Sequence, residues 1–228
     1  MKFSKFEDKI RFHFNDPRLL EQAFTHRSYI NENRAQGREH NERLEFLGDA
    51  VLELVVTEFL FAKYPGKPEG DLTSYRAALV NTVSISDAAT KLGMNEFLLL
   101  SRGEAKDTGR ARQIILANAF EALIGALYLD QGYEPAKDFI AAQLFHKTDE
   151  VVEKGLWQDA KSRFQEIAQE KNGFTPSYDV ISQTGPDHDK SFEVGVYLNG
   201  ERIASGEGRS KQEAEQDAAQ KALAAKGW

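Results

Sequence analysis

The sequence predicts a multidomain protein, with an all-α domain at residues 1–150, a linker at 151–157 and a small α+β domain at 158–228. Apolar residues recur at helical spacing throughout the first part, where no stretch alternates as a strand does. After the linker, three short alternating runs lie between two helical patterns, which gives the order α-β-β-β-α. The chain has 228 residues, of which 41% are hydrophobic, enough for a substantial core.

Helix boundaries in the first part are marked by capping residues and by Gly or Pro. One helix begins at Asn15 or Asp16, because either suits an N-cap before Pro17 in the first turn. We expect the opening stretch to continue as a helix to about Lys63, where the sequence YPGKPEG stops it. Three further helical patterns follow, at 71–93, 115–132 and 134–147.

The second part begins with a helical pattern that ends at Gly173. Asn199 and Gly200 form a hairpin signal between the second and third alternating runs. Ser210 is expected to cap a closing helix that is rich in Ala and Gln. The predicted strands are 177–185, 190–200 and 202–210, and the closing helix is 210–226.

Composition excludes several classes of chemistry. The chain has no Cys, which rules out disulfides, thiolate metal sites and Cys nucleophiles. Its net charge is −7, so any binding of a polyanion must depend on local patches or on bound cations. The N-terminus lacks the apolar core of a signal peptide, and no apolar run approaches the ~18 residues of a membrane span. We therefore expect a cytoplasmic protein that has no membrane partner.

Three carboxylates lie inside a stretch that otherwise predicts a buried helix, HNERLEFLGDAVLELV. Glu42, Glu45 and Asp49 are spaced i, i+3, i+7, which places them on one stripe of the helix. Such a stripe is usually a solvated acidic face. Here no basic residue follows at i+4 to pair with Glu45 or Asp49, and unpaired carboxylates are costly where a helix is largely buried. Clustered acids in such a place indicate a bound cation.

A second apolar helical run, ILANAFEALIGALYLD, carries matching groups. Asn118 and Glu121 are spaced i, i+3 on one face, although each could equally be an ordinary helix amide or surface acid. Two helices that carry oxygen ligands at this spacing can cross to form a site made of oxygen atoms. Such a site suits Mg²⁺ or Mn²⁺, and these ions promote phosphodiester hydrolysis.

Several motifs together resemble bacterial ribonuclease III. The stretch NERLEFLGD at 41–49 is similar to the signature of that family, and THRSY at 25–29, LTSYRAALVN at 72–81 and the ILANAFEALIGALYLD run agree with it. The C-terminal part resembles a double-stranded-RNA-binding domain, through GPDHDKSF at 185–192 and GRSKQEAEQDAA at 208–219. The resemblance covers almost the whole chain.

The resemblance implies a metal-dependent endonuclease whose all-α domain forms a homodimer. Members of the family cleave double-stranded RNA to 5′-phosphate and 3′-hydroxyl ends with short 3′ overhangs, and they process precursors of ribosomal RNA, some mRNA and tRNA. The implied cofactor is Mg²⁺, for which Mn²⁺ can substitute. Carried over by position, the implied site residues are Asp49 and Glu121 as catalytic acids, Glu45, Asp49, Asn118 and Glu121 as metal ligands, and Glu42 and Glu69 as acids that assist at the cleavage site.

Asn118 departs from the pattern of the family, which usually has Asp at this position. Its amide oxygen can still bind Mg²⁺, but it contributes no charge. We expect metal binding to be weaker and activity to survive, because three anions remain. The alternative is a catalytically impaired protein that binds double-stranded RNA as a scaffold.

An acidic protein can bind double-stranded RNA because such RNA is recognised by shape, through small patches that reach two minor grooves and the phosphates between them. The resemblance assigns one patch to the first helix of the second domain, one to the loop Pro186–Asp189 and one to the start of the last helix, where the N-terminus of the helix favours phosphate. The predicted RNA-binding residues are Gln165, Glu166, His188, Arg209, Ser210 and Lys211.

Overall fold

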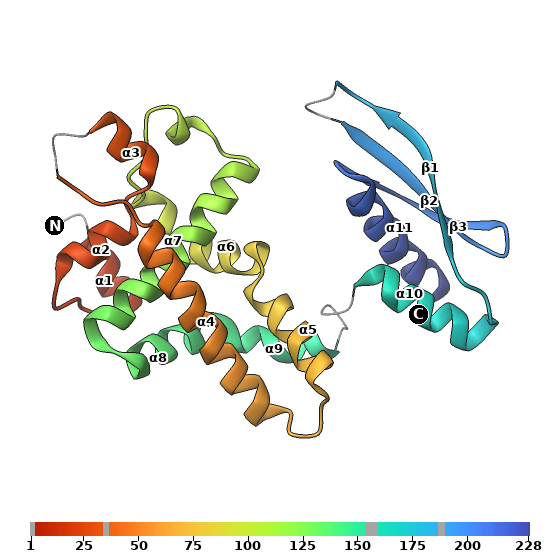
Figure 1. The fold of residues 1–228 in the computed structure, drawn as a ribbon, viewed down its shortest axis with the longest axis horizontal. Coiled ribbons are helices and arrows are strands. Elements are labelled where there is room, and N and C mark those ends of the chain that lie inside the picture. Colours follow the sequence, from red (N-terminus) through yellow and green to blue (C-terminus); the bar gives the residue numbers. More distant parts are fainter. Residues whose placement is uncertain (1–2, 34–36, 154–158, 187–189) are drawn as a thin grey trace. The chain divides into compact units, whose positions relative to one another are not determined.

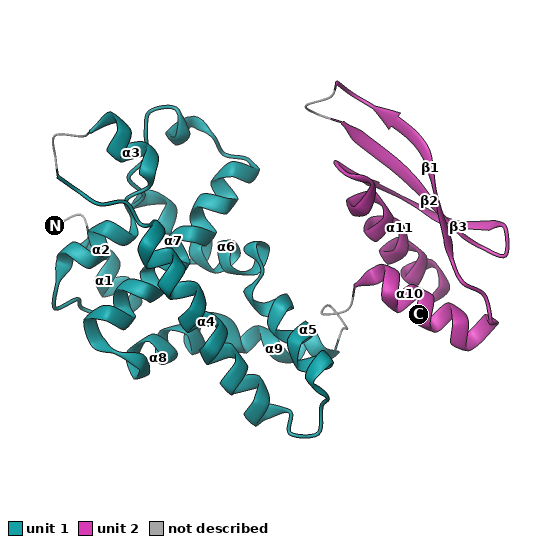
Figure 2. Cartoon of the chain, viewed as in Figure 1, with its two compact units in different colours: residues 1–157 teal, residues 158–228 magenta. Residues whose placement is uncertain are grey.

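The computed structural model describes residues 3–33, 37–153, 159–186 and 190–228. The chain forms two compact units, residues 1–157 and 158–228, which are coloured separately in Figure 2. The first unit is helical, and the second is a three-stranded sheet with two helices (Figure 1). The predicted fold class is therefore confirmed.

The helical unit is built around two long helices that pack against each other, α4 and α7, of 22 residues each. Its α-helices are α1 (Ser4–Ile10), α2 (Pro17–Ala23), α3 (Arg27–Glu32), α4 (Glu42–Lys63), α5 (Glu69–Val80), α6 (Thr82–Lys91), α7 (Arg110–Gln131), α8 (Tyr133–Leu144) and α9 (Thr148–Glu153). Short 3-10 turns lie at η2 (Met94–Glu96), η3 (Glu104–Lys106) and η4 (Phe145–Lys147).

Helix α7 forms the centre of the core. Almost every residue from Ile115 to Leu127 is buried, because α2, α4, α6 and α8 pack around it. Of the helices in the described ranges, α7 alone is long and apolar enough to cross a membrane. Its burial among the other helices identifies it as a core helix.

The far end of α7 also fixes the start of α2. The Asp130 carboxylate accepts hydrogen bonds from the backbone N–H groups of Asn15 (2.7 Å) and Asp16 (2.8 Å). Asp16 is the N-cap, since its side chain accepts from the backbone N–H of Arg18 at 3.0 Å, and Pro17 is the first helical residue. Of the two predicted caps, Asp16 is confirmed.

The prediction of one helix that continues to Lys63 is wrong, although α4 does end at Lys63. The chain forms α2, α3 and α4 instead. A neighbouring loop holds Thr25 in an extended bridge, because Leu99 donates to the carbonyl of Phe24 (2.8 Å) and accepts from the N–H of His26 (3.1 Å). These long-range backbone bonds end α2 where local sequence would allow it to continue.

The predicted helix at 71–93 is divided into α5 and α6 at Asn81. The backbone of Asn81 is extended (φ −67°, ψ 159°), and its side chain caps α6 by accepting from the N–H of Ser84 at 2.9 Å. Asn side chains compete with helical hydrogen bonds in this way. The first residues of the predicted linker, 151–153, belong to α9, which packs against α5, and residues 154–157 lie outside the described ranges.

The second unit has the predicted order. Helix α10 (Ala160–Asn172) precedes strands β1 (Ser177–Thr184), β2 (Ser191–Leu198) and β3 (Glu201–Gly208), and α11 (Lys211–Lys226) closes the unit. The strands form an antiparallel sheet in the order β1-β2-β3. Asn199 and Gly200 have positive φ angles (49° and 80°), as a tight hairpin turn requires, so the hairpin signal is confirmed.

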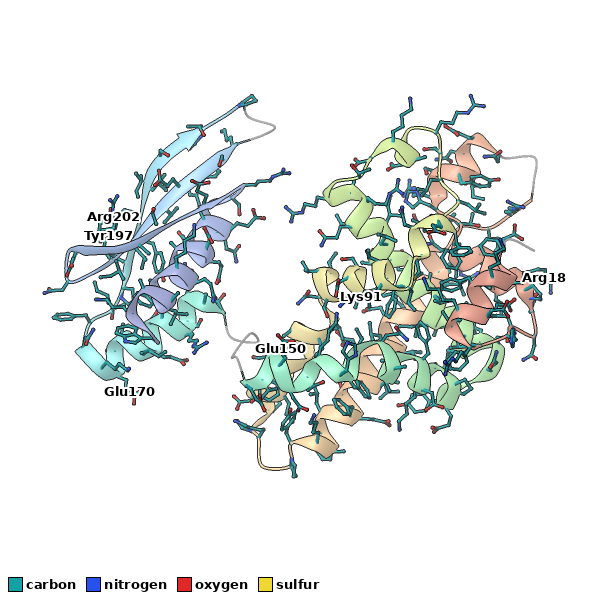
Figure 3. All side chains as sticks on the ribbon, turned by 180° about the vertical axis from the view of Figure 1, so that it is seen from behind. Arg18, Lys91, Glu150, Glu170, Tyr197 and Arg202 are labelled. Atoms are coloured by element: carbon teal, nitrogen blue, oxygen red, sulfur yellow. The ribbon has the colours of Figure 1, made fainter. Side chains whose placement is uncertain are left out.

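One face of this sheet packs on α10 and α11, around Phe164 and Val196. Gly206 allows α11 to approach β3, since a Cβ atom at Gly206 would lie 2.1 Å from the backbone nitrogen of Ala218. Tyr197 and Arg202 are paired neighbours on β2 and β3, as Figure 3 shows. The sheet thus carries two helices on one face.

Candidate active site and RNA-binding surface

Two glycines determine how closely α4 and α7 cross. A Cβ atom at Gly48 of α4 would lie 1.8 Å from the backbone oxygen of Glu121, and one at Gly125 of α7 would lie 2.2 Å from the backbone oxygen of Leu44. Both positions therefore exclude any side chain. Figure 1 shows α4 and α7 passing over each other in the helical unit, where they pack together.

The same crossing brings together four of the predicted site residues. Glu45 and Asp49 flank Gly48 on α4, while Glu121 and Asn118 lie one and two turns before Gly125 on the facing stripe of α7. Asp49 is exposed, whereas Glu45, Asn118 and Glu121 are half-buried. The structure thus assembles the predicted metal-ligand set at one place.

The electrostatics of this cluster are those of carboxylates that lack cations. Burial, followed by repulsion from Asp49 and Glu45, raises the pKa of Glu121 to about 8. Burial and repulsion from Glu42 also raise the pKa of Glu45, while a hydrogen bond from the Asn118 side chain opposes that rise. Among the described residues, no Lys or Arg is a cause of either shift in pKa.

The residues present fit a hard divalent cation. The donors are carboxylate and amide oxygens, which Mg²⁺ and Mn²⁺ prefer, and the partly buried Glu121 carboxylate gains a counter-charge when such an ion binds. Within the described ranges, no three His, Cys, Asp or Glu side chains already close around an ion position. Binding of one ion by all four residues would therefore require their side chains to move closer together.

Glu42 and Glu69 begin different helices and do not meet within one chain. Glu42 lies in the first turn of α4, where it is 3.3 Å from the guanidinium of Arg27. Glu69 begins α5 beyond the other end of α4, and its carboxylate accepts from the hydroxyl of Thr73 at 2.9 Å. Because α4 has 22 residues, about 33 Å of helix separates these ends.

The C-terminal unit presents most of the predicted RNA-binding residues. Gln165 and Glu166 are exposed on α10, and Arg209 and Lys211 are exposed where α11 begins. The Ser210 hydroxyl serves as the N-cap of α11, since it accepts from the backbone N–H of Glu213 at 3.1 Å. That bond leaves the hydroxyl hydrogen available to a phosphate. The predicted contact at His188 lies outside the described residues.

An exposed apolar stripe runs along α4, on a different side from the core. Phe46, Leu54 and Phe61 are 82%, 52% and 73% exposed and lie at helical spacing. Phe46 and Leu47 also line a surface hollow together with Leu129 of α7. Large apolar side chains that are this exposed mark a surface suited to another protein.

Two residues that determine the geometry of the site, Gly48 and Gly125, were not among the residues predicted from the sequence. Each is an isolated glycine inside an apolar helical pattern, in LEFLGD and in ALIGAL. Glycine destabilises a helix interior by ~1 kcal/mol relative to Ala, so its presence there indicates close packing. That signal was present in the sequence, but it does not say which helix approaches.

Comparisons with known proteins agree with this architecture. A Ribonuclease-III-like family model matches residues 16–148, and a double-stranded RNA binding motif matches residues 160–226. Ribonuclease 3 of Bacillus velezensis is 48% identical over 98% of this chain and 89% of its own length, and that of Bacillus licheniformis is 49% identical over the same shares. The nuclease domain of ribonuclease III from Campylobacter jejuni superposes with a TM-score of 0.56 and 42% identity, over 62% of this chain and 97% of that domain.

Domain order, the acidic crossing of α4 and α7, and relatives nearly half identical over almost the whole chain lead to one assignment. The chain belongs to the ribonuclease III family of double-stranded-RNA endoribonucleases.

Proposed function

We propose that the protein cleaves double-stranded RNA with Mg²⁺, to 5′-phosphate and 3′-hydroxyl ends with short 3′ overhangs. The observation that carries this proposal is the cluster of Glu45, Asp49, Asn118 and Glu121 at the glycine crossing. Three acids for which the described residues show no ion pair, on two helices whose backbones are in close contact, are suited to a divalent cation.

Each site residue has a proposed task. When bound, the cation would activate the attacking water and neutralise charge on the phosphate oxygens. Asp49 and Glu121 hold it from opposite helices, with Glu45 and the amide oxygen of Asn118 completing the set. Asp49 is the exposed member, so it faces the side from which RNA must approach. Mn²⁺ would be accepted as well, because it uses the same oxygen donors.

The active form is proposed to be a homodimer. Within one chain, the length of α4 separates Glu69 from the acid cluster, so a second copy is needed to bring Glu69 near it. The exposed stripe of Phe46, Leu54 and Phe61 offers a surface for that copy. Two acid clusters in one dimer would each cut one strand, which accounts for the offset ends.

The C-terminal unit is proposed to hold the RNA by its shape, through α10, the loop that contains His188 and the start of α11. This division of labour allows an acidic protein to bind a polyanion, since only small patches need to be cationic. Precursors of ribosomal RNA, and some mRNA and tRNA, are the proposed substrates. The cytoplasm, where bacterial RNA is made, is the compartment that this function requires.

A hairpin assay tests the proposal. A labelled RNA hairpin of about two helical turns, long enough for a binding site of ~16 base pairs, is incubated with the protein in Mg²⁺, in Mn²⁺ and in chelator. We expect cuts in both strands that depend on the metal and are offset to give 3′ overhangs. Single-strand cuts, or cuts in chelator, would contradict the proposed mechanism.

Binding without cleavage in either metal would favour the second candidate, an RNA-binding scaffold. The specific observation behind that candidate is Asn118, which lacks the charge of the usual Asp. Asn118→Asp then decides between the two: recovery of cleavage would show that the missing charge is the cause.

A further inference from the structure

We infer that Gln216 and the Lys161–Glu215 pair form a polar clamp between α10 and α11, which fixes the spacing of the two RNA contacts that these helices carry. The inference rests on the RNA-binding role proposed above for the C-terminal unit. It assigns a positioning role to three residues that are not among the proposed RNA contacts.

The position of α10 depends on α11. Among the described elements of the second unit, α11 packs on β2 and β3, whereas α10 packs chiefly on α11. Figure 1 shows the two helices beside each other. Gln165 and Glu166 belong to α10, while Arg209 and Lys211 lie at the start of α11. The distance between these two proposed RNA contacts is therefore set by the way α10 lies on α11.

Most of the buried side chains between the two helices are alanines. Alanine lets helices approach closely but interlocks little with its neighbours, so it specifies their relative rotation weakly. A polar network whose members are all paired specifies one arrangement better. The buried residues of the two helices in this core are Ala160, Phe164, Ala168, Ala218, Ala219, Ala222 and Leu223.

Gln216 of α11 holds the first turn of α10 with both ends of its amide. Its Oε1 accepts a hydrogen bond from the backbone N–H of Ala160 at 3.0 Å, and its Nε2 donates to the Asp159 carboxylate. Asp159 is the N-cap of α10, since its other oxygen accepts from the backbone N–H of Ser162 at 2.9 Å. One N–H group that a helix start leaves unpaired is thus satisfied by a residue of the other helix.

Lys161 forms the second half of the clamp. Its ammonium lies 2.5 Å from the Glu215 carboxylate and 4.9 Å from the centre of the Tyr178 ring. The two side chains of the ion pair are only 33% and 25% exposed, which limits screening by solvent. A lysine in the first turn is unfavourable for the dipole of α10 alone. The acid from α11 compensates for it, so this ion pair joins the two helices.

Both halves of the clamp lie near the proposed RNA contacts. Gln216 follows Lys211 by five residues on α11, and Gln165 follows Ala160 by five residues on α10. At 1.5 Å per residue, each contact lies about 8 Å along its helix from the clamp. A rotation of α10 at the clamp would displace Gln165 and Glu166 relative to the start of α11. Because double-stranded RNA is recognised by shape, one duplex could then no longer make both contacts.

Gln216→Leu tests the inference with RNA duplexes of two lengths, in chelator to prevent cleavage that depends on metal. The change removes both hydrogen bonds with little change in side-chain volume. A duplex of ~16 base pairs, which spans both contacts, should bind about tenfold more weakly, whereas a duplex of ~8 base pairs should bind as it does to the wild type. Gln220→Leu, one turn further along α11, is the matched control and should retain the wild-type preference for the longer duplex.

Reversal of the ion pair provides a rescue. Lys161→Glu and Glu215→Lys should each reduce the preference for the longer duplex, because each places two like charges together. The double variant restores opposite charges and has the net charge of the wild type, so the preference should return. The ratio of the two affinities is the readout, since a change in net charge alone weakens or strengthens binding at both lengths.

Spin labels measure the spacing of the two contacts without RNA. Because the chain has no Cys, Glu166→Cys and Lys211→Cys place one label on each helix, and electron paramagnetic resonance gives the distance between them. The distance distribution should broaden or shift when Gln216→Leu is added, and it should be unchanged when Gln220→Leu is added.

An unchanged distance distribution for Gln216→Leu would overturn the inference, as would a wild-type preference for the longer duplex in that variant. If the wild type showed no such preference, the proposed RNA-binding role would fail. The distances between the labels would still decide whether Gln216 fixes α10 on α11.

Discussion

Asp49 is the most exposed acid of the cluster, and its neighbours Glu45 and Glu121 are held half-buried by the crossing of their helices. In the proposed mechanism, Asp49→Asn removes one negative charge from the metal ligands and keeps the shape of the side chain. The functional consequence of single residues can therefore be tested with little change to the fold.

Asp49→Asn should lower cleavage by about 10³-fold, because a cation at this site supplies several kcal/mol of transition-state stabilisation. RNA binding should be unchanged, since the C-terminal unit is untouched. Single-turnover cleavage and a gel-shift titration measure the two effects. Glu53→Gln, one turn further along α4, is the control and should retain cleavage. If Asp49→Asn still cut RNA, the assignment of the site would be wrong.

His26 makes the stability of the helical unit depend on pH. Its ring accepts from the N–H of Ser28 (3.3 Å) and thereby caps α3, which requires the neutral form. Burial lowers the pKa of His26 below 6.5, and the charges that face it are Glu104, Arg27, Glu42 and His40.

Because the pKa of His26 is lower in the folded chain, the unfolded chain binds the extra proton as pH falls through 6.5. Stability should therefore be full above this pH and decrease below it. His26→Asn keeps a capping group without titrating, so urea unfolding should show a smaller pH dependence between pH 7 and 5. The exposed His146 provides the control, and His146→Asn should retain the wild-type dependence.

At the scale of elements, the contact between α4 and α7 and the start of α11 set the positions of the proposed site residues. The backbones of α4 and α7 touch at two glycines, and this contact places the acids. Helix α11 begins at Lys211, next to Arg209, and this helix start places the two cations that are proposed to bind phosphate. In both cases the packing or the end of a helix determines where these side chains lie.

Gly48→Ala should destabilise the protein by about 1–3 kcal/mol, because the added methyl group meets the backbone of Glu121 and forces the helices apart. Cleavage should fall with it, even in the fraction that remains folded. Gly70→Ala is the matched control in α5, where nothing lies within 4 Å. That change should be neutral or stabilising by ~0.4–1 kcal/mol. Denaturant unfolding measures the stability of both variants. Equal free energies of unfolding for Gly48→Ala and Gly70→Ala would contradict this prediction.

Lys211→Gln should weaken RNA binding to a similar degree for hairpins of different sequence, because a phosphate contact carries no sequence information. The slope of log affinity against log salt should decrease by about 1. Lys226→Gln, at the opposite end of α11, is the control. If the slope for Lys211→Gln were the same as for the wild type, Lys211 would not contact an RNA phosphate.

At the scale of the whole molecule, two units with separate cores carry separate tasks. The described part of the helical unit holds one acid cluster, so in the proposed mechanism two chains would be needed to cut both strands of RNA. The exposed stripe on α4 provides a surface for that assembly.

Mixed dimers of wild-type and Asp49→Asn chains should cut only one strand of the RNA, because they contain one intact acid cluster. Differently tagged chains allow the mixed species to be purified, and hairpins labelled on either strand report the cuts. Wild-type dimers purified in the same way should cut both strands. Cleavage of both strands by the mixed dimers would show that one cluster serves both.

The sequence by itself determined the fold class, the acids of the cluster and the family, because these depend on periodicity and on residue identity at fixed spacing. Glu45, Asp49, Asn118 and Glu121 were all found in this way. The three strands were predicted to within one or two residues at each end, and the Asn199-Gly200 hairpin was predicted from its local turn chemistry.

Only the tertiary structure decided where helices break and how closely they cross. Leu99, more than 70 residues away, holds Thr25 in an extended bridge just after α2 ends, and no local pattern near Thr25 contains that information. The contact of Gly48 with Glu121 likewise joins positions far apart in the chain. Whether three carboxylates form a solvated face or a metal site depends on that contact, because the approach of a second helix is what desolvates them.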